Sequence, residues 1–192
     1  MKQEILDFYR KTSPYTDLGY YKDFAKNLPD DMEELCYLQR MQIIHPVVFK
    51  KDKEVRLKKE SFWGDMTKVP AAMLDFEDDI FPTAQGILAE LLRRDSRYFA
   101  GREAKDKVHV TCRGQAILLA GTLKAKGIPA RARSGFAEYI GSDGIYRDHW
   151  ITEYFDEKED RWKLADADLH CPDHEIPFDL NDIPCDNFLF GA

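Results

Sequence analysis

The sequence predicts an α+β fold, in which N-terminal helices and a central helix beginning at Cys112 pack on an antiparallel β-sheet. Apolar residues recur at helical spacing in the first half of the 192 residues, whereas apolar and polar residues alternate in runs after residue 128. We expect a single domain over residues 1–192. Its parts are a helical region over 1–107, the central helix and sheet over 108–169, and an extension over 170–192.

Three helices are predicted before the central one. The first covers about residues 2–11, the second follows Asp30 as its N-cap and is ended by Pro46, and the third covers about residues 83–94. Their apolar residues at helical spacing are Ile5, Leu6 and Tyr9, then Met32, Leu35, Cys36, Leu38 and Met41, then Ile87, Leu88, Leu91 and Leu92.

The central helix is predicted from Cys112 to Lys126, behind Thr111 as N-cap. Gly127 suits the C′ position, and Pro129 prevents the helix from continuing. One stripe at i, i+4 spacing is expected to pack on the sheet, and Gly121 to allow a close approach of backbones. The stripe contains Cys112, Ala116, Leu119, Ala120 and Leu123.

Three alternating runs, residues 129–140, 145–155 and 161–168, predict strands. Turn-forming residues at 141–144 and a charged turn at 156–159 separate them. Because such short connections join antiparallel neighbours, the sheet is predicted to be a meander of at least three strands.

A four-residue loop at 141–144 would set Glu138 opposite Arg147, a favourable cross-strand pair, and Phe136 opposite His149. In this register Trp150 faces away from His149 and covers Gly135, so we expect a buried tryptophan.

A four-residue loop at 156–159 would set Ile151 opposite Leu164, and His149 opposite Asp166. A six-residue loop would instead set His149 opposite Asp168. Periodicity cannot decide between the two aspartates, because both lie on the same face of the strand. Shorter hairpin loops are commoner, which favours Asp166.

Composition narrows the function classes. The net charge of −7 argues against nucleic acid as the main partner. The basic stretch 50–59 has no interleaved aromatic residues and is expected to be a solvated linker. No run approaches the ~18 apolar residues of a membrane span. The N-terminus has no apolar signal region, so we expect a cytoplasmic protein with reduced cysteines and no membrane partner.

A cysteine, a histidine and an aspartate can supply thiol acyl-transfer chemistry. Cys112 begins the predicted helix, where the positive end of the helix favours the thiolate and free N–H groups face a developing oxyanion. A thiol nucleophile needs a base, here His149, and the base needs an acceptor, here Asp166 or Asp168. Taken singly, Cys112 and His149 would also fit a buried core thiol and a core histidine.

Four segments resemble the core of the transglutaminase-like superfamily, whose fold is similar to that of papain-type cysteine proteases. This resemblance implies Cys112 as nucleophile, His149 as base and Asp166 as its orienting partner. The segments are Cys112-Arg113-Gly114-Gln115-Ala116, residues 127–136 beginning Gly-Ile-Pro-Ala-Arg, Asp148-His149-Trp150-Ile151-Thr152-Glu153-Tyr154, and Trp162-Lys163-Leu164-Ala165-Asp166.

Two further segments, Leu28-Pro29-Asp30-Asp31 and Ile44-His45-Pro46, resemble the region preceding this core in bacterial members of unassigned substrate. Thr111 stands where many members have glycine, and the chain ends at Ala192, sooner than expected of such members.

We therefore expect a thiol-dependent acyl-transfer enzyme that acts on peptide or protein amides through an acyl-thioester, with hydrolysis favoured over amine transfer. The alternative is a non-catalytic binding or scaffolding module with the same fold. No cofactor is predicted, and no metal site. Three potential metal ligands within residues 170–174, His170, Cys171 and His174, lack the second ligand pair that zinc sites usually have.

Overall fold

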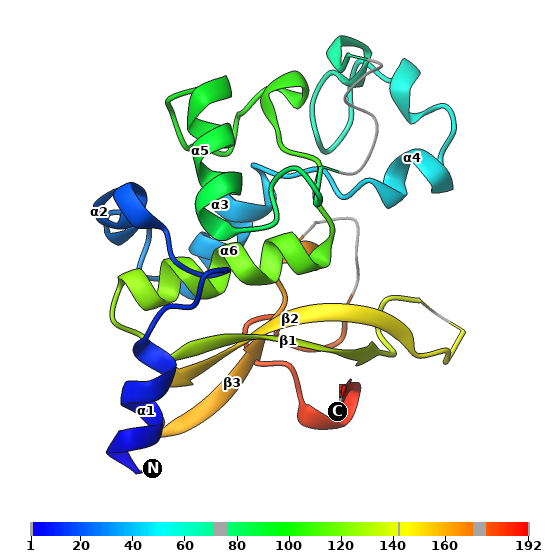
Figure 1. Ribbon diagram of the computed structural model, residues 1–192. Helices are drawn as coiled ribbons and strands as arrows, with labels where there is room; N and C mark the ends of the chain where they lie inside the picture. Colours follow the sequence, from blue (N-terminus) through cyan, green and yellow to red (C-terminus); the bar gives the residue numbers. More distant parts are fainter. Residues whose placement is uncertain (1, 71–76, 142, 171–175, 192) are drawn as a thin grey trace.

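The computed structural model describes residues 2–70, 77–141, 143–170 and 176–191, and confirms the α+β fold. A four-stranded antiparallel sheet forms one layer. The helix α6 (Cys112–Ala125) lies on this sheet, and α3 (Met32–Arg40) and α5 (Ala84–Arg94) lie beyond it (Figure 1). The helix that begins at Cys112 is thus the middle layer.

The predicted helices form with small shifts of their ends. The helix α1 covers Gln3–Arg10, and α5 is capped by the Thr83 side chain, which accepts from the N–H of Gly86. Short helices that the periodicity does not predict are α2 (Lys22–Lys26) and α4 (Val47–Lys51). Within the described ranges, none of the helices is long and apolar enough to cross a membrane.

The second predicted helix is shifted at its start and shorter at its end. Asp31, not Asp30, is the N-cap of α3, because its side chain accepts from the N–H of Glu34. The helix ends at Arg40 rather than at Pro46. After it the chain extends so that Ile43 forms a parallel bridge with Val108, which takes residues 42–44 out of the helix.

The basic stretch 50–59 is exposed at its lysines, as expected, but it is not a free linker. It contains the end of α4 and a 3₁₀ turn, Val55–Leu57. Val55 is 2% exposed and packs with Ile44 and Met66 in a small core of its own, which anchors the segment.

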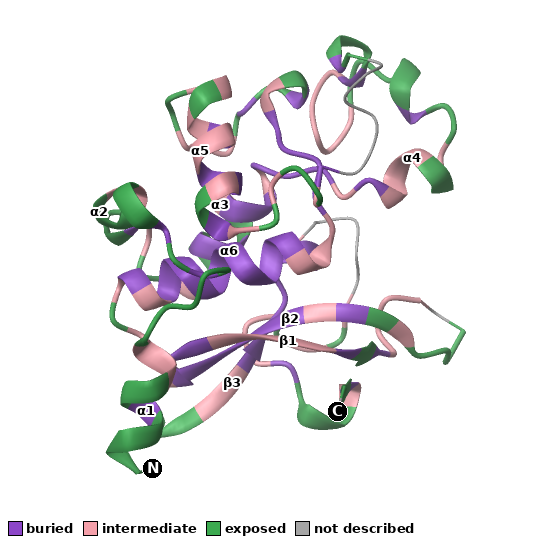
Figure 2. Ribbon diagram, viewed as in Figure 1, coloured by how far each residue is buried: buried purple, intermediate pink, exposed green. Residues whose placement is uncertain are grey.

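The helix α6 is buried over most of its length (Figure 2). The predicted stripe contacts the sheet: Leu119, Ala120 and Leu123 form one apolar cluster with strand residues that include Tyr154. Its other side packs on α5 in a second cluster. A Cβ at Gly121 would lie only 2.8 Å from the carbonyl oxygen of Thr16, so this position requires glycine.

The sheet has the order β3-β2-β1-β4. Its strands are β1 (Ala130–Ala137), β2 (Arg147–Asp156), β3 (Arg161–Ala165) and β4 (Phe188–Phe190). Strand β4 comes from the predicted C-terminal extension and pairs with β1. In the same extension, Ile183 donates its N–H to the carbonyl oxygen of Leu164 and packs with Ile151 and Phe188.

The register of the first hairpin is wrong by one residue in the prediction. His149 pairs with Gly135, not Phe136, and Arg147 pairs with Ala137, not Glu138. The loop is longer than expected because β1 ends at Ala137 and β2 begins at Arg147. Arg147 forms its ion pair within this loop, with Asp143 at 2.6 Å.

The register of the second hairpin is wrong by two residues in the prediction. Glu153, not Ile151, pairs with Leu164, and Asp156 pairs with Arg161. If β3 continued in this register, Asp168 would lie opposite His149, as in the six-residue-loop alternative. The strand ends at Ala165, however, so the register does not decide where Asp166 and Asp168 lie.

Candidate active site

Cys112 is the first residue of α6, at its partly buried N-terminus. Thr111 occupies the N-cap position, but its side chain makes no capping hydrogen bond. Instead the Thr111 hydroxyl donates to Asp78 Oδ1 at 2.7 Å, and its N–H is also bound by this carboxylate. Thr111 therefore fixes the approach to the helix rather than capping it.

The first turn of α6 consequently keeps free hydrogen-bond donors. In the part of the chain that the structure describes, the N–H groups of Cys112, Arg113 and Gly114 have no acceptor. Such groups, together with the positive end of the helix, stabilise negative charge beside the thiol. This arrangement favours both a thiolate and an oxyanion.

His149 lies on β2 and is 3% exposed, and its Nε2 is 2.7 Å from Asp166 Oδ2. Asp166 is 1% exposed. An imidazole held by a buried carboxylate at this distance has a fixed orientation and tautomer. The structure therefore brings His149 and Asp166 together, although the predicted register is wrong.

Asp166 reaches His149 because the chain turns away from the sheet after Ala165. Its Oδ1 accepts from the N–H groups of Asp168 and Leu169, at 3.0 and 3.3 Å, and so caps a 3₁₀ turn, Ala167–Leu169. Its own N–H donates to the carbonyl oxygen of Leu180 at 2.9 Å. These bonds leave Oδ2 directed at the histidine.

Tyr139 is a site residue that the sequence reasoning missed. Its hydroxyl donates to Asp166 Oδ2 at 3.0 Å, and its ring packs edge-on against His149 and Phe178. No signal marked it, because the predicted strand 129–140 included Tyr139 as an ordinary strand residue, whereas β1 ends at Ala137. Its hydrogen bond helps to keep the Asp166 carboxylate ionised.

The Cys112 thiol interacts with two imidazoles. Burial raises the pKa of this thiol, but hydrogen bonds to His149 and His45 outweigh that effect, and the pKa lies below its ordinary value. The predicted nucleophile is thus next to its predicted base, in surroundings that favour the thiolate.

In the His149–Asp166 pair, the charge of each side chain favours the ionised form of the other. Burial lowers the pKa of His149, but the negative charge of Asp166 and its hydrogen bond raise it well above the ordinary value. Burial raises the pKa of Asp166, but the imidazolium outweighs this and lowers it. The pair therefore favours an imidazolium beside a thiolate.

His45 is the second site residue that the sequence reasoning did not assign. It lies in the loop between α3 and α4, and its Nδ1 accepts from the N–H of Val47 at 3.2 Å. Its Nε2 is 3.8 Å from Asp168 Oδ2. Asp168 in turn accepts from Gln115 Nε2 at 3.1 Å. In the sequence, His45 was marked only by the resemblance of the Ile44-His45-Pro46 segment, which assigned no function to the histidine.

The other described cysteines have different environments. Cys36 is buried, as its helical stripe predicted, and burial raises the pKa of its thiol. Cys185 is exposed. The candidate ligands at residues 171–174 lie outside the described residues. Among the residues described, no cluster of three or more side chains could hold a metal ion.

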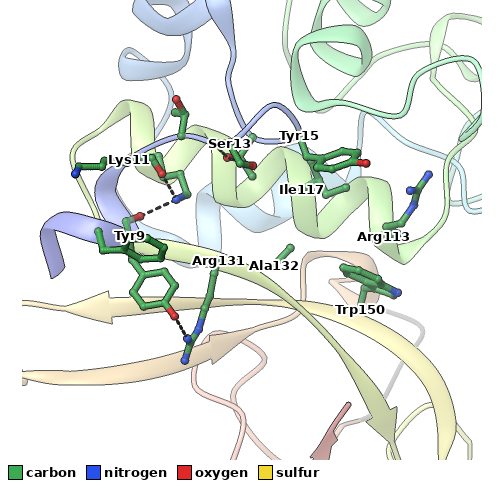
Figure 3. Close-up of a pocket in the computed structure, with 13 residues that line it drawn as sticks. Tyr9, Lys11, Ser13, Tyr15, Arg113, Ile117, Arg131, Ala132 and Trp150 are labelled. Carbon is green, nitrogen blue, oxygen red and sulfur yellow. Dashed lines mark hydrogen bonds between the residues drawn. The ribbon is translucent and has the colours of Figure 1, made fainter. Parts of the chain in front are cut away.

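Two cavities meet beside the thiol. The smaller, of about 450 Å³, is lined by Cys112, His45 and three carboxylates: Asp78, Asp79 and Asp148. The larger, of about 690 Å³, follows α6 away from the thiol and is mainly apolar. Figure 3 shows this larger cavity between α6, the N-terminal segment and β1.

Arg113 and Trp150 line both cavities and lie at the same end of the larger one (Figure 3). Trp150 is half-buried and pairs with Ser134, so the expectation that it is buried over Gly135 is wrong. The one-residue shift of the hairpin is the cause. Arg113 makes no hydrogen bond or ion pair with another described residue. Both side chains are therefore available to a ligand.

Comparison with known proteins supports the fold. No match was found among family models, and none among curated proteins. The chain is similar to the crystal structure of a candidate cysteine protease from Cytophaga hutchinsonii, with 12% sequence identity and a TM-score of 0.51. The match covers 99% of this chain and 46% of that one, so this chain spans about half its length. At this identity the similarity shows the fold alone.

Proposed function

We propose that this protein is a thiol-dependent acyl-transfer enzyme of the transglutaminase-like superfamily that cleaves amide bonds. The observation that carries the proposal is the His149–Asp166 contact of 2.7 Å next to a thiol at a helix N-terminus. Each role in such chemistry has a residue: Cys112 is the nucleophile, His149 the base and Asp166 the group that orients it.

The reaction would proceed in two halves. His149 accepts the thiol proton, and the Cys112 sulfur attacks the amide carbon to form a tetrahedral oxyanion. The C–N bond breaks as the imidazolium returns the proton to the leaving amine, which gives an acyl-thioester. Water then attacks the thioester, His149 takes its proton, and the acid and the thiol are released.

The cavities suggest where the substrate lies. The amide would occupy the smaller cavity over Cys112, and side chains of a peptide or protein substrate would occupy the larger, apolar one. Arg113 and Trp150 at the junction would contact the residue nearest the amide. Water remains our first choice as acceptor, with amines second.

The test is formation of an acyl-enzyme. A fluorogenic peptide library and an active ester are incubated with wild type and Cys112→Ala, and the acyl-enzyme is detected by mass spectrometry. Wild type should turn over and Cys112→Ala should not, with little change in its melting temperature, because only one sulfur at a helix end is removed. Cys185→Ala is the matched control and should behave as wild type.

Addition of a primary alkyl amine to the assay shows whether water or an amine accepts the acyl group. Hydrolysis predicts an unchanged rate and a free-acid product, whereas amine transfer predicts a faster release and an amide product. Turnover that persists in Cys112→Ala would contradict the nucleophile assignment. A wild-type thiol that no acyl donor modifies would favour the non-catalytic binding module.

A further inference from the structure

Two imidazoles, not one, interact with the candidate nucleophile, and the reaction set out above uses only His149. We propose that His45 is a further catalytic residue: its Nε2–H donates a hydrogen bond to the substrate carbonyl oxygen as negative charge develops there. This proposal rests on the proposed function, since it concerns the same site and the same oxyanion.

The hydrogen bond at its other nitrogen makes His45 Nε2 a donor. Nδ1 accepts from the N–H of Val47, so in the neutral ring the proton must be on Nε2. The bond from Val47 requires the neutral ring, because a protonated Nδ1 cannot accept a hydrogen. In this neutral tautomer Nε2–H is a donor.

The carboxylate next to His45 is too distant to occupy this donor. Asp168 Oδ2 lies 3.8 Å from Nε2, beyond hydrogen-bond distance, while Asp168 Oδ1 is bound by Gln115. Asp168 therefore attracts the ring without accepting its hydrogen. His149 differs, because its Nε2 is fully engaged by Asp166 at 2.7 Å.

The position of His45 suits the oxygen rather than the nitrogen of the amide. His45 and Cys112 line the same cavity. After attack, the carbonyl oxygen is two bonds from the Cys112 sulfur, so a donor that lines the cavity over this sulfur can reach that oxygen. The free N–H of Cys112 supplies a second donor, and the two together form an oxyanion hole.

The experiment compares two reactions of the same thiol. Acylation by an active ester, p-nitrophenyl acetate, forms an oxyanion; alkylation by iodoacetamide displaces iodide and forms none. Both rates are measured on their high-pH plateaus, so that a changed thiol pKa does not enter. The proteins are wild type, His45→Ala and His45→Gln, each with Cys171 and Cys185 replaced by serine so that the labelling reports on Cys112.

We expect acylation of His45→Ala to fall by about 10²–10³-fold, the usual effect of losing one oxyanion donor, while alkylation changes only a few-fold. His45→Gln keeps an N–H donor and should recover part of the acylation rate. A thermal melt and the alkylation rate together report whether each variant is folded.

Equal losses in both reactions would overturn the proposal, because His45 would then act on the thiol itself. An unchanged acylation rate in His45→Ala would overturn it as well, while the proposed function would stand. A wild-type protein that is alkylated but never acylated would instead contradict the proposed function. The failures of the two proposals are thus distinguishable.

Discussion

The Cys112 thiol interacts with two imidazole–carboxylate pairs that have the same chemistry and different geometry. In the first, His149 and Asp166 are in contact at 2.7 Å, with side chains 4% and 1% exposed. In the second, His45 and Asp168 are 3.8 Å apart, with side chains 19% and 8% exposed. The closer and more buried pair holds its ring through the carboxylate. The looser pair holds its ring through the backbone of Val47.

This difference teaches how one residue type can serve two roles at one thiol. The Nε2 of His149 is bound by a buried carboxylate, which stabilises the imidazolium and so suits a base. The Nδ1 of His45 accepts from a backbone N–H, so the hydrogen of the neutral ring is on Nε2, which suits a hydrogen-bond donor. The distance to the carboxylate thus distinguishes the two proposed roles.

Replacing Asp166 or Asp168 with asparagine tests whether the two pairs have different roles. Of the changes considered, one of these should have the largest effect on kcat. Asp166→Asn should lower kcat by up to about 10⁴-fold, as the corresponding change does in a serine-protease triad, because the wrong tautomer of His149 is favoured. Asp168→Asn should cost about tenfold or less, because Asp168 makes no hydrogen bond to His45. Steady-state kinetics on the best peptide measures both.

A larger loss for Asp168→Asn than for Asp166→Asn would reverse the assignment of the two pairs. Asp179→Asn is a matched control in which the carboxylate caps a surface turn, where it accepts from the N–H of Asn181. It should behave as wild type.

The pH dependence of alkylation tests the tighter pair next. Because the pKa of Cys112 is lowered by its two imidazole partners, iodoacetamide should modify it well below pH ~8.5, the value of a free thiol. His149→Ala should move the midpoint upward by more than His45→Ala does, because Asp166 keeps His149 protonated and the positive charge of His149 lowers the pKa of the thiol. Mass spectrometry of the protein lacking Cys171 and Cys185 follows the label. Equal shifts of the pH midpoint in the two variants would show that the two histidines affect the thiol in the same way, which would contradict the difference between the pairs.

Stability against pH should show the His149–Asp166 pair directly. The pKa of Asp166 lies below its ordinary value of 3.8, so its stabilisation is present above that pH and is lost as pH falls through the folded-state pKa. The pKa of His149 lies above 6.5, so its stabilisation is complete below 6.5 and is lost as pH rises through the folded-state pKa.

Wild type should therefore exceed Asp166→Asn in unfolding free energy by the most between pH 3.8 and 6.5, by about 1–3 kcal/mol. This difference in unfolding free energy should become smaller below pH 3.8 and above pH 6.5. Urea unfolding at several pH values measures it. A difference that does not vary with pH would mean that the two side chains are not coupled as ions.

Trp150→Ala should have the smallest effect on the chemistry, although Trp150 is next to His149 in the chain. The ring is half-buried, so its loss should cost about 1–2 kcal/mol of unfolding free energy, less than the 3–5 kcal/mol of a fully buried aromatic. Because it lines both cavities, KM should rise while kcat changes little. A fall in kcat comparable to that of Asp166→Asn would show that the two pairs are not the only determinants of rate.

Sequence periodicity predicted the helix at Cys112, the meander and the stripe on α6, because burial of one face imposes these patterns. It did not predict the registers, which depend on where each strand ends. Asp166 meets His149 because the chain leaves the sheet after Ala165, and a capped 3₁₀ turn has no periodic signal. His45 and Tyr139 could not be found for a related reason: each lies outside a regular element, and its role depends on contacts distant in sequence.

The hydrogen bond from Asp166 to Leu180 has a consequence for biosynthesis. The turn that carries Asp166 is held by residues around 180–183, and β4 pairs with β1. A ribosome makes these segments after the thiol and the base. A nascent chain therefore carries Cys112 and His149 before it can orient them. The carboxylate that contacts His149 is therefore placed only after residues around 180–183 have been made and have folded against the sheet.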